Sequence, residues 1–247
     1  MKKFKERKTK ASGKRTLAID VGGTGLKASV LDSRGRMMAD RVRIDTPYPC
    51  PPRVLVEALN KLIKPLPAFD RVSVGFPGVV RAGRILTAPH FGNHAWKGFD
   101  LAAALSAKWG KPVRILNDAD MQGLAVIRGK GVELVVTLGT GVGTGLYWHG
   151  HLAPHLELAH HPLRKGETYN EHVGDKTLKK IGVKKWNRRL RRALATLRVL
   201  INFDRLYIGG GNASKINLTL DPDMKIVSNT AGILGGVRLW EHPVERI

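Results

Sequence analysis

Residues 17–31 read LAIDVGGTGLKASVL, which is an apolar segment, a glycine-rich turn and a second apolar segment. Apolar runs of this length bounded by glycines predict two strands joined by a turn. A further turn is expected at 32–35, with a third strand over 37–44. Residues 134–148, LVVTLGTGVGTGLYW, repeat the layout. The repeat predicts a duplicated α/β fold, with two lobes and a cleft between them.

The rest of the chain supplies the other elements of two such lobes. Helical periodicity predicts helices over 54–63, 99–109 and 119–127, and short apolar runs predict strands over 71–75, 113–116 and 205–208. A hairpin is expected over 79–87. We therefore place the N-terminal lobe at 17–118 and the C-terminal lobe at 119–228. A last segment, 229–247, contains a helix over 230–240 that is expected to return to the first lobe.

Composition narrows the class of protein. Of the 247 residues, 43% are hydrophobic and 25% are charged, which suits a folded chain with a sizeable core. No apolar run approaches the ~20 residues of a membrane span, and the lysine-rich start lacks the apolar stretch of a signal peptide. We therefore expect a cytoplasmic protein with no membrane partner. The single cysteine, Cys50, excludes an internal disulfide framework and a multi-cysteine zinc site.

The positive charge is excessive and unevenly placed. Lys and Arg number 42 against 20 Asp and Glu, a formal net charge of +22, which points to a polyanionic partner. Residues 1–16 form a basic arm that we expect to be disordered. Residues 176–198 contain ten basic residues and no acid, with Leu190, Leu194 and Leu197 at helical spacing. This segment is interpreted as an amphipathic helix whose cationic face binds an anion; a merely solvated face is the alternative.

Three glycine-rich turns follow predicted strands. They lie at 22–25, 139–141 and 209–211, and glycines there let backbone amides converge on an anion. None has the spacing of a Walker A loop, and the first returns into a strand instead of opening a helix. Each alone is compatible with an ordinary turn, but together they predict a phosphate clamp that closes from both lobes. Its predicted members are Gly22, Gly23, Thr24, Gly139, Thr140, Gly141, Gly210 and Gly211.

Two charged residues flank the first turn. Asp20 ends the first strand, where a carboxylate can orient Mg²⁺ or its waters against bound phosphates. The alternative is that its side chain only caps the amides of the turn. Lys27 lies in the following strand, where it either reaches a phosphate or is a surface lysine.

The segment ILNDAD at 115–120 puts an amide and two carboxylates at the end of a predicted buried strand, the end at which α/β folds bind ligands. Asp118 is the candidate general base, accepting a proton from a substrate hydroxyl that attacks a phosphoryl group. Asp120 is assigned as a helix cap or as a neighbour of the metal. The alternative is that either aspartate only caps the following helix.

Glu157 and His160 lie three residues apart after the second hairpin, so that both can face one pocket and bind neighbouring hydroxyls of a sugar. A packed histidine is the alternative for His160. A zinc or other metal site has little support here, because no further Cys or acid occurs at ligand spacing.

Four ordered motifs resemble those of the ROK (repressor, ORF, kinase) family, and within it the chain is most similar to the polyphosphate glucokinases. The motifs are IDVGGTG at 19–25, LNDAD at 116–120, LGTGVG at 138–143 and ELAH at 157–160, followed by GGG at 209–211. The resemblance runs from about residue 17 to residue 240. It implies an actin-like (ribonuclease H-like) fold, transfer of a phosphoryl group to the 6-hydroxyl of glucose, and a homodimer.

The resemblance also implies roles for individual residues. Asp118 is the expected base, with Asn117 and Asp118 holding sugar hydroxyls. Glu157 and His160 complete the sugar site, Asn93 matches a sugar-contacting loop, and Pro77 and Gly78 line the same pocket. A further sugar-binding acid is expected downstream, and the register leaves Glu171 and Asn170 as alternatives. Two departures are Ala159, where the family has glycine, and the missing cysteine-rich zinc motif, which the polyphosphate glucokinases also lack.

Charge suggests the donor. Linear polyphosphate is a dense polyanion without a base, so it needs a cationic track, which residues 176–198 supply. The hypothesis is a polyphosphate-dependent glucokinase that uses Mg²⁺ with its donor, with ATP as a possible second donor; a strictly ATP-dependent glucokinase or hexokinase is the alternative. Some relatives are repressors, but the sixteen residues before Leu17 are too few for a helix-turn-helix module, so no sequence-specific binding of nucleic acid is expected.

Overall fold

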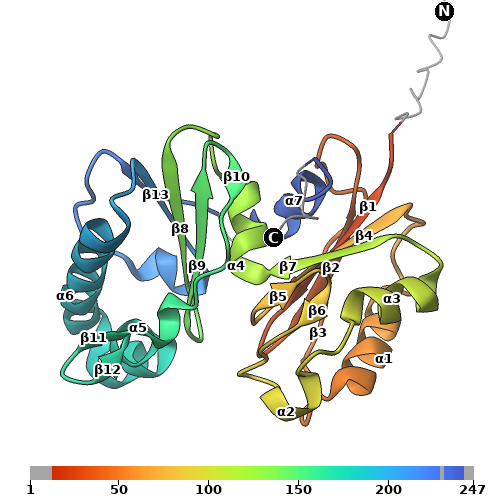
Figure 1. The fold of residues 1–247 in the computed structure, drawn as a ribbon, viewed down its shortest axis with the longest axis horizontal. Coiled ribbons are helices and arrows are strands. Elements are labelled where there is room, and N and C mark those ends of the chain that lie inside the picture. Colours follow the sequence, from red (N-terminus) through yellow and green to blue (C-terminus); the bar gives the residue numbers. More distant parts are fainter. Residues whose placement is uncertain (1–12, 229–230, 242–247) are drawn as a thin grey trace, which may run out of the picture.

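The computed structural model describes residues 13–228 and 231–241, and it consists of two lobes, each built on a five-stranded sheet (Figure 1). The first twelve residues of the predicted arm and six of the C-terminal residues lie outside the described residues. The sheet of the first lobe has the order β3-β2-β1-β4-β7. Its strands are β1 (Thr16–Val21), β2 (Leu26–Leu31), β3 (Val42–Ile44), β4 (Arg71–Phe76) and β7 (Val113–Asn117).

The second lobe repeats this topology. Its sheet has the order β10-β9-β8-β13-β14, formed by β8 (Val132–Leu138), β9 (Val142–Trp148), β10 (His151–Leu152), β13 (Arg205–Gly209) and β14 (Met224–Ile226). In both lobes the first three strands along the chain pair antiparallel and the remaining pairs are parallel. The predicted duplicated α/β fold is therefore confirmed.

Helices cover the sheets and lie between them. The first lobe carries α1 (Pro52–Leu62), α2 (Asn93–Trp96) and α3 (Leu101–Trp109), and the second carries α5 (Tyr169–Val173) and α6 (Asp175–Ile201). Helices α4 (Asp118–Leu124) and α7 (Ala231–Arg238) lie between the two sheets (Figure 1). The smaller elements are β5 (Val80–Arg81), β6 (Arg84–Ile85), the 3₁₀ turns η1 (Leu158–His160) and η2 (Gly211–Lys215), β11 (Pro162–Arg164) and β12 (Glu167–Thr168).

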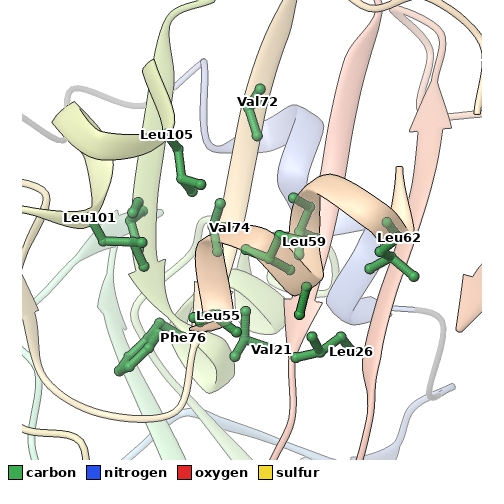
Figure 2. Close-up of a cluster of buried hydrophobic side chains, with 14 of the residues drawn as sticks. Val21, Leu26, Leu55, Leu59, Leu62, Val72, Val74, Phe76, Leu101 and Leu105 are labelled. Carbon is green, nitrogen blue, oxygen red and sulfur yellow. The ribbon is translucent and has the colours of Figure 1, made fainter. Parts of the chain in front are cut away.

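The core of the first lobe explains why α1 forms where it does. Leu55, Leu59 and Leu62 recur on one face of α1 and are buried in the same hydrophobic cluster as Val72 and Val74 of β4 (Figure 2). Burying one leucine side chain contributes about 1.5–3 kcal/mol, so this face holds α1 on the sheet. The sheet in turn sets where the end of β4 and the β1–β2 turn lie.

The basic segment forms α6, as predicted, with its apolar face inward. Leu190, Leu194 and Leu197 are buried in the core of the second lobe, while Lys184 and Arg188 are exposed. The helix is not continuous, because Gly182 has φ 75° and ψ 162° and separates a short first part from the longer remainder. Glycine adopts a positive φ without steric cost, so the break falls at this residue.

Helix α7 packs closely on the first lobe. A Cβ on Gly235 would lie 1.8 Å from the Met121 carbonyl oxygen of α4, and one on Gly236 would lie 2.8 Å from the Ala18 Cβ of β1. Ser73 Oγ donates a hydrogen bond of 2.6 Å to the Gly236 carbonyl. The two glycines therefore allow α7 to contact α4 and β1 together.

The third strand is shorter than predicted. Only Val42–Ile44 pair with β2, and Met37 contributes an isolated bridge with Leu31. The Asp32 carboxylate accepts hydrogen bonds of 2.9 Å from the backbone N–H groups of Arg34 and Arg36, so those donors serve a turn and not a sheet ladder. Across the described ranges, we find no helix that is both long enough and apolar enough to span a bilayer.

Candidate active site

A cleft of about 430 Å³ lies between the lobes. It is lined by residues from both sheets, from α4 and from the segments that follow β10 and β13. Most residues that the sequence singles out meet in it: Asp20, Gly22, Gly23, Thr24, Lys27, Pro77, Gly78, Asp118, Gly139, Thr140, Gly141, Glu157, His160, Gly210 and Gly211. The tertiary fold therefore brings motifs from both halves of the chain to one cavity.

The β1–β2 turn is held by hydrogen bonds within it and from the loop between β3 and α1. The Gly22 N–H donates to the Gly25 carbonyl over 3.1 Å, which closes the turn. Thr46 Oγ1 donates to the Gly22 carbonyl over 2.7 Å, and Tyr48 Oη donates to the Gly23 carbonyl over 2.6 Å. Because these carbonyls are engaged by donors from the β3–α1 loop, the turn has a defined shape at the edge of the cleft.

The corresponding β8–β9 turn is held in a similar way. The Gly139 N–H donates to the Gly141 carbonyl over 2.9 Å, and the Asp175 N–H donates to the Gly139 carbonyl over 3.1 Å. Asp175 is the first residue of α6, so the basic helix begins at this turn. Gly210, on the neighbouring loop, has φ 85°, and a Cβ on it would lie 2.3 Å from the Leu138 carbonyl oxygen. Only glycine allows this approach.

Asp20 and Lys27 form an ion pair in the cleft. They are directly opposed in the β1–β2 ladder, and the Lys27 Nζ lies 3.0 Å from the Asp20 Oδ2. Lys27 is therefore not an isolated surface lysine. The pair places one carboxylate and one ammonium group beside the first glycine turn.

Asp118 is the first residue of α4, and Asn117 caps that helix. The Asn117 Oδ1 accepts hydrogen bonds from the N–H groups of Ala119 (2.8 Å) and Asp120 (3.3 Å), while its Nδ2 donates to the Gly78 carbonyl over 3.1 Å. The buried Asn117 side chain thus orients the start of α4 and does not line the cleft. Asp120 is not the helix cap that the sequence suggested, because Asn117 already accepts the hydrogen bonds of the first free N–H groups of α4.

The environment of Asp118 suits a general base. Burial, together with the negative charge of Asp20, raises the pKa of Asp118 to about 7, although a hydrogen bond from the Ala119 N–H opposes the shift. A base with a pKa near the working pH combines a useful unprotonated fraction with a strong drive to accept a proton. The side chain still reaches the cleft, where it is partly exposed.

His160 ends η1, Glu157 directly precedes that turn, and both residues line the cleft. A hydrogen bond from His155 lowers the pKa of Glu157, which keeps this carboxylate ionised. His90, which sequence reasoning missed, reaches the cleft from the loop after β6 and interacts electrostatically with both residues. Burial lowers the pKa of His90, so its ring is neutral near pH 7. A cluster of polar side chains from both lobes therefore lines this part of the cleft.

Asn93, like Asn117, is an expected sugar ligand that does not line the cleft, and of the two alternatives Asn170 and Glu171 only Asn170 lines it. Asn93 begins α2 outside the cleft lining, and its Oδ1 accepts from the Ala88 N–H over 2.6 Å. Asn170 lines the cleft, and its Oδ1 accepts from the Val142 N–H over 2.7 Å. Glu171 instead forms a capping box with Thr168 at the start of α5. The sequence had no local signal to separate these neighbours.

The cleft offers carboxylates of the kind that Mg²⁺ prefers. Among the described residues, no group of three or more His, Cys, Asp and Glu side chains is arranged to hold a metal ion alone. Magnesium in phosphoryl-transfer sites is bound by one or two carboxylates together with substrate phosphates, so the Asp20 position fits this role. The mutual repulsion of Asp20 and Asp118 also favours a cation nearby.

Cys50 is buried in the first lobe, and burial raises its pKa to about 11.

Comparisons with known proteins agree with this arrangement. The family model described as the ROK family matches residues 16–162. A polyphosphate glucokinase from Mycobacterium tuberculosis is 31% identical over 235 residues, which cover 88% of this chain and 88% of that protein. A polyphosphate glucokinase from Mycobacterium leprae is 29% identical, over 90% of this chain and 73% of that protein.

Solved structures also match both lobes. The crystal structure of an inorganic polyphosphate/ATP-glucomannokinase from Arthrobacter sp. strain KM has a TM-score of 0.82 and 29% identity, covering 93% of this chain and 100% of that one. A ROK family glucokinase from Streptomyces griseus, solved with glucose and AMPPNP, has a TM-score of 0.72 over 91% of this chain and 98% of that one. At 19% identity, the second likeness concerns the fold alone.

Proposed function

Because the chain belongs to the ROK family, we propose that it is a glucokinase that transfers the terminal phosphoryl group of inorganic polyphosphate to the 6-hydroxyl of glucose. The observation that carries the proposal is the meeting of Asp118, Glu157 and His160 with two glycine turns in one cleft. The similarity to polyphosphate glucokinases over 88% of the chain supports the same activity.

The cleft residues divide the reaction between them. Glu157 and His160 hold sugar hydroxyls, and the proton of the 6-hydroxyl passes to the Asp118 carboxylate. The sugar oxygen forms a bond to the terminal phosphorus while the bond from that phosphorus to the bridging oxygen breaks. The products are glucose 6-phosphate and a polyphosphate shorter by one unit. Such transfers depend mainly on positioning and on electrostatic stabilisation of the donor oxygens.

The glycine turns and Asp20 act on the donor. The β1–β2 and β8–β9 turns offer backbone N–H groups from both lobes to the phosphate oxygens. Asp20 would hold Mg²⁺ together with the donor phosphates. When bound, the ion neutralises part of the charge on the phosphoryl oxygens. Lys27 adds a positive charge beside the same turn.

Helix α6 gives polyphosphate a path beyond the cleft. It begins at the β8–β9 turn, because Asp175 bonds to Gly139, and its exposed side includes Lys184, Arg188 and Arg191. A phosphate chain whose end lies in the cleft can continue along this cationic side. This path is specific to a polyanionic donor, since ATP has too few charges to occupy it.

A comparison of donors tests the function. Purified protein is assayed for glucose 6-phosphate formation with polyphosphate and with ATP in parallel, each at low and at high salt. We expect robust activity with polyphosphate, and a KM for polyphosphate that rises steeply with salt by counterion release. Robust turnover with ATP and none with polyphosphate would reject polyphosphate as the donor. Mannose in place of glucose, in the same assay, measures the sugar range.

Three further features stay predictions. The resemblance implies a homodimer, which analytical ultracentrifugation of the full chain tests. The charge and the apolar pattern imply a cytoplasmic location. Asn93 and Asn117 are proposed as sugar ligands only for a closed form of the cleft, because neither lines it in the described conformation.

A further inference from the structure

His155 lies behind the sugar side of the cleft and contacts two carboxylates. Its Nδ1 is 2.8 Å from the Asp120 Oδ2, and its Nε2 is 3.5 Å from the Glu157 Oε1. The side chains of His155 and Asp120 are only 7% and 3% exposed, whereas Glu157 reaches the cleft. The imidazole thus bridges a buried acid and a cleft acid.

We infer that His155 is a positioning residue that holds the Glu157 carboxylate toward the sugar and ties it to the helix that begins with Asp118. Nothing in the sequence motifs assigns it a role, since it precedes the Glu157–His160 motif by two residues. The inference rests on the proposed glucose site. His155 does not line the cleft, so it acts through Glu157 and not on the substrate.

Both ring nitrogens have an acceptor that suits a charged imidazolium. Burial by itself lowers the pKa of His155, but its hydrogen bonds with Asp120 and Glu157 outweigh burial and raise the pKa to about 10. At neutral pH the ring therefore carries two N–H donors, one for each carboxylate. The Nδ1 atom makes a hydrogen bond of 2.8 Å with Asp120, and the Nε2 atom makes an ion-pair contact of 3.5 Å with Glu157, so one rigid ring links the two acids.

Asp120 connects His155 to α4, the helix that begins with Asp118. It lies in the first turn of α4, two residues after Asp118, and its backbone carbonyl accepts a hydrogen bond from the Tyr147 hydroxyl of β9. Its Oδ1 has no hydrogen-bond partner among the described residues, so His155 is the side-chain partner through which its carboxylate is held. Burial raises the pKa of Asp120 and the hydrogen bond from His155 opposes this shift, so the carboxyl group depends on this partner.

Replacement of His155 tests the inference. In His155→Phe, we expect the KM for glucose to rise about 10- to 100-fold, because the Glu157 carboxylate loses its orientation, while the KM for polyphosphate changes less than about twofold. The control is His151→Phe, an exposed histidine on β10, for which both constants should stay unchanged. His155→Gln retains a donor for Asp120 and is used if the phenylalanine variant does not fold.

A double-mutant cycle distinguishes positioning from a merely structural role. If His155 acts through Glu157, adding His155→Phe to Glu157→Gln should change the KM for glucose by less than about twofold. If the increases in KM of the two single variants multiply in the double variant, the inference is overturned. It is also overturned if His155→Phe lowers the Tm and leaves the KM for glucose unchanged.

A crystal structure of His155→Gln gives a readout that does not depend on activity. We expect the Glu157 side chain to be displaced or disordered in it, and an unmoved Glu157 would overturn the inference. Absence of glucose phosphorylation by the wild-type protein would instead overturn the proposed function, and the crystallographic test would still decide the role of His155.

Discussion

Asp20 and Lys27 oppose each other across the β1–β2 ladder, and their charged groups lie 3.0 Å apart in the cleft. The strand pairing sets this contact, because residues on either side of a short turn are held on the same face of the sheet. It gives the cleft, beside the first glycine turn, both a carboxylate that can orient a cation and an ammonium group that can contact phosphate.

Replacing Lys27 with Met is expected to weaken donor binding selectively. The KM for polyphosphate should rise roughly tenfold, since one charge-assisted contact to a phosphate is lost, while the Kd for glucose stays the same. Steady-state kinetics and calorimetry measure the two constants. Lys64→Met, an exposed lysine just after α1, is the matched control. An equal loss of glucose binding would show that Lys27 supports the fold of the cleft and not the donor.

Replacing Asp118 with Asn should remove the base and retain the site. Turnover is expected to fall by about 10²- to 10⁴-fold, the contribution typical of a general base, with glucose binding within a few-fold of the wild type. A coupled assay of glucose 6-phosphate and calorimetry with glucose check both. Near-normal turnover in this variant would remove Asp118 from the base role.

The pH dependence of the reaction should report the pKa of Asp118. The base accepts a proton only when ionised, and its pKa is raised to about 7, so kcat/KM for glucose should fall tenfold per pH unit below about 7 and level off above it. His90→Asn is the control, because burial lowers the pKa of His90 and its removal should leave this limb in place. A limb near pH 4 would mean that the base titrates like an ordinary carboxyl.

Charges on α6 should govern the salt dependence of polyphosphate use. Lys184, Arg188 and Arg191 lie on one exposed side of the helix, and changing all three to Gln should raise the KM for polyphosphate and flatten its salt dependence. Each phosphate contact that is lost should reduce the slope of log KM against log salt by about 0.7, if polyphosphate behaves like a single-stranded polyanion.

The matched control removes the same charge from the other lobe. Changing Lys61, Lys64 and Lys97 to Gln alters the net charge equally, and all three are exposed. If both triple variants change the salt slope alike, polyphosphate responds to net charge and not to a track along α6.

The contact between α7 and α4 should be sensitive to a single methyl group. In Gly235→Ala the new Cβ would lie 1.8 Å from the Met121 carbonyl oxygen, so α7 must move, at a cost of about 1–3 kcal/mol in the free energy of unfolding. Gly232→Ala, in the same helix, meets nothing within 4 Å and should stabilise by up to about 1 kcal/mol through helix propensity. Urea unfolding measures both, and equal effects would contradict the packing argument.

Much of the fold could be predicted because its signals are local. The two strand–glycine turn–strand segments, the apolar face of α6 and the buried strand before Asp118 all follow from the spacing of residues close in the chain. The predicted third strand was too long, because the residue pattern does not show that the Asp32 carboxylate accepts hydrogen bonds from the backbone N–H groups of Arg34 and Arg36. The break at Gly182 likewise depends on a backbone conformation that periodicity does not encode.

The site was predicted where a motif names the residue and missed where only packing selects it. Asp118, Glu157 and the glycine turns reach the cleft as expected, whereas Asn117 turns inward to cap α4. His90 belongs to no motif, and it joins the site because its loop folds toward the second lobe.

By itself, the sequence determined a duplicated α/β protein with three glycine turns and a strong excess of positive charge, because strand alternation, glycine and net charge are properties of neighbouring residues. Only the tertiary structure decided that Asn170 and not Glu171 faces the cleft, and that His155 lies between Asp120 and Glu157. Those outcomes depend on how segments distant in the chain pack together, and no local pattern of residues specifies that packing.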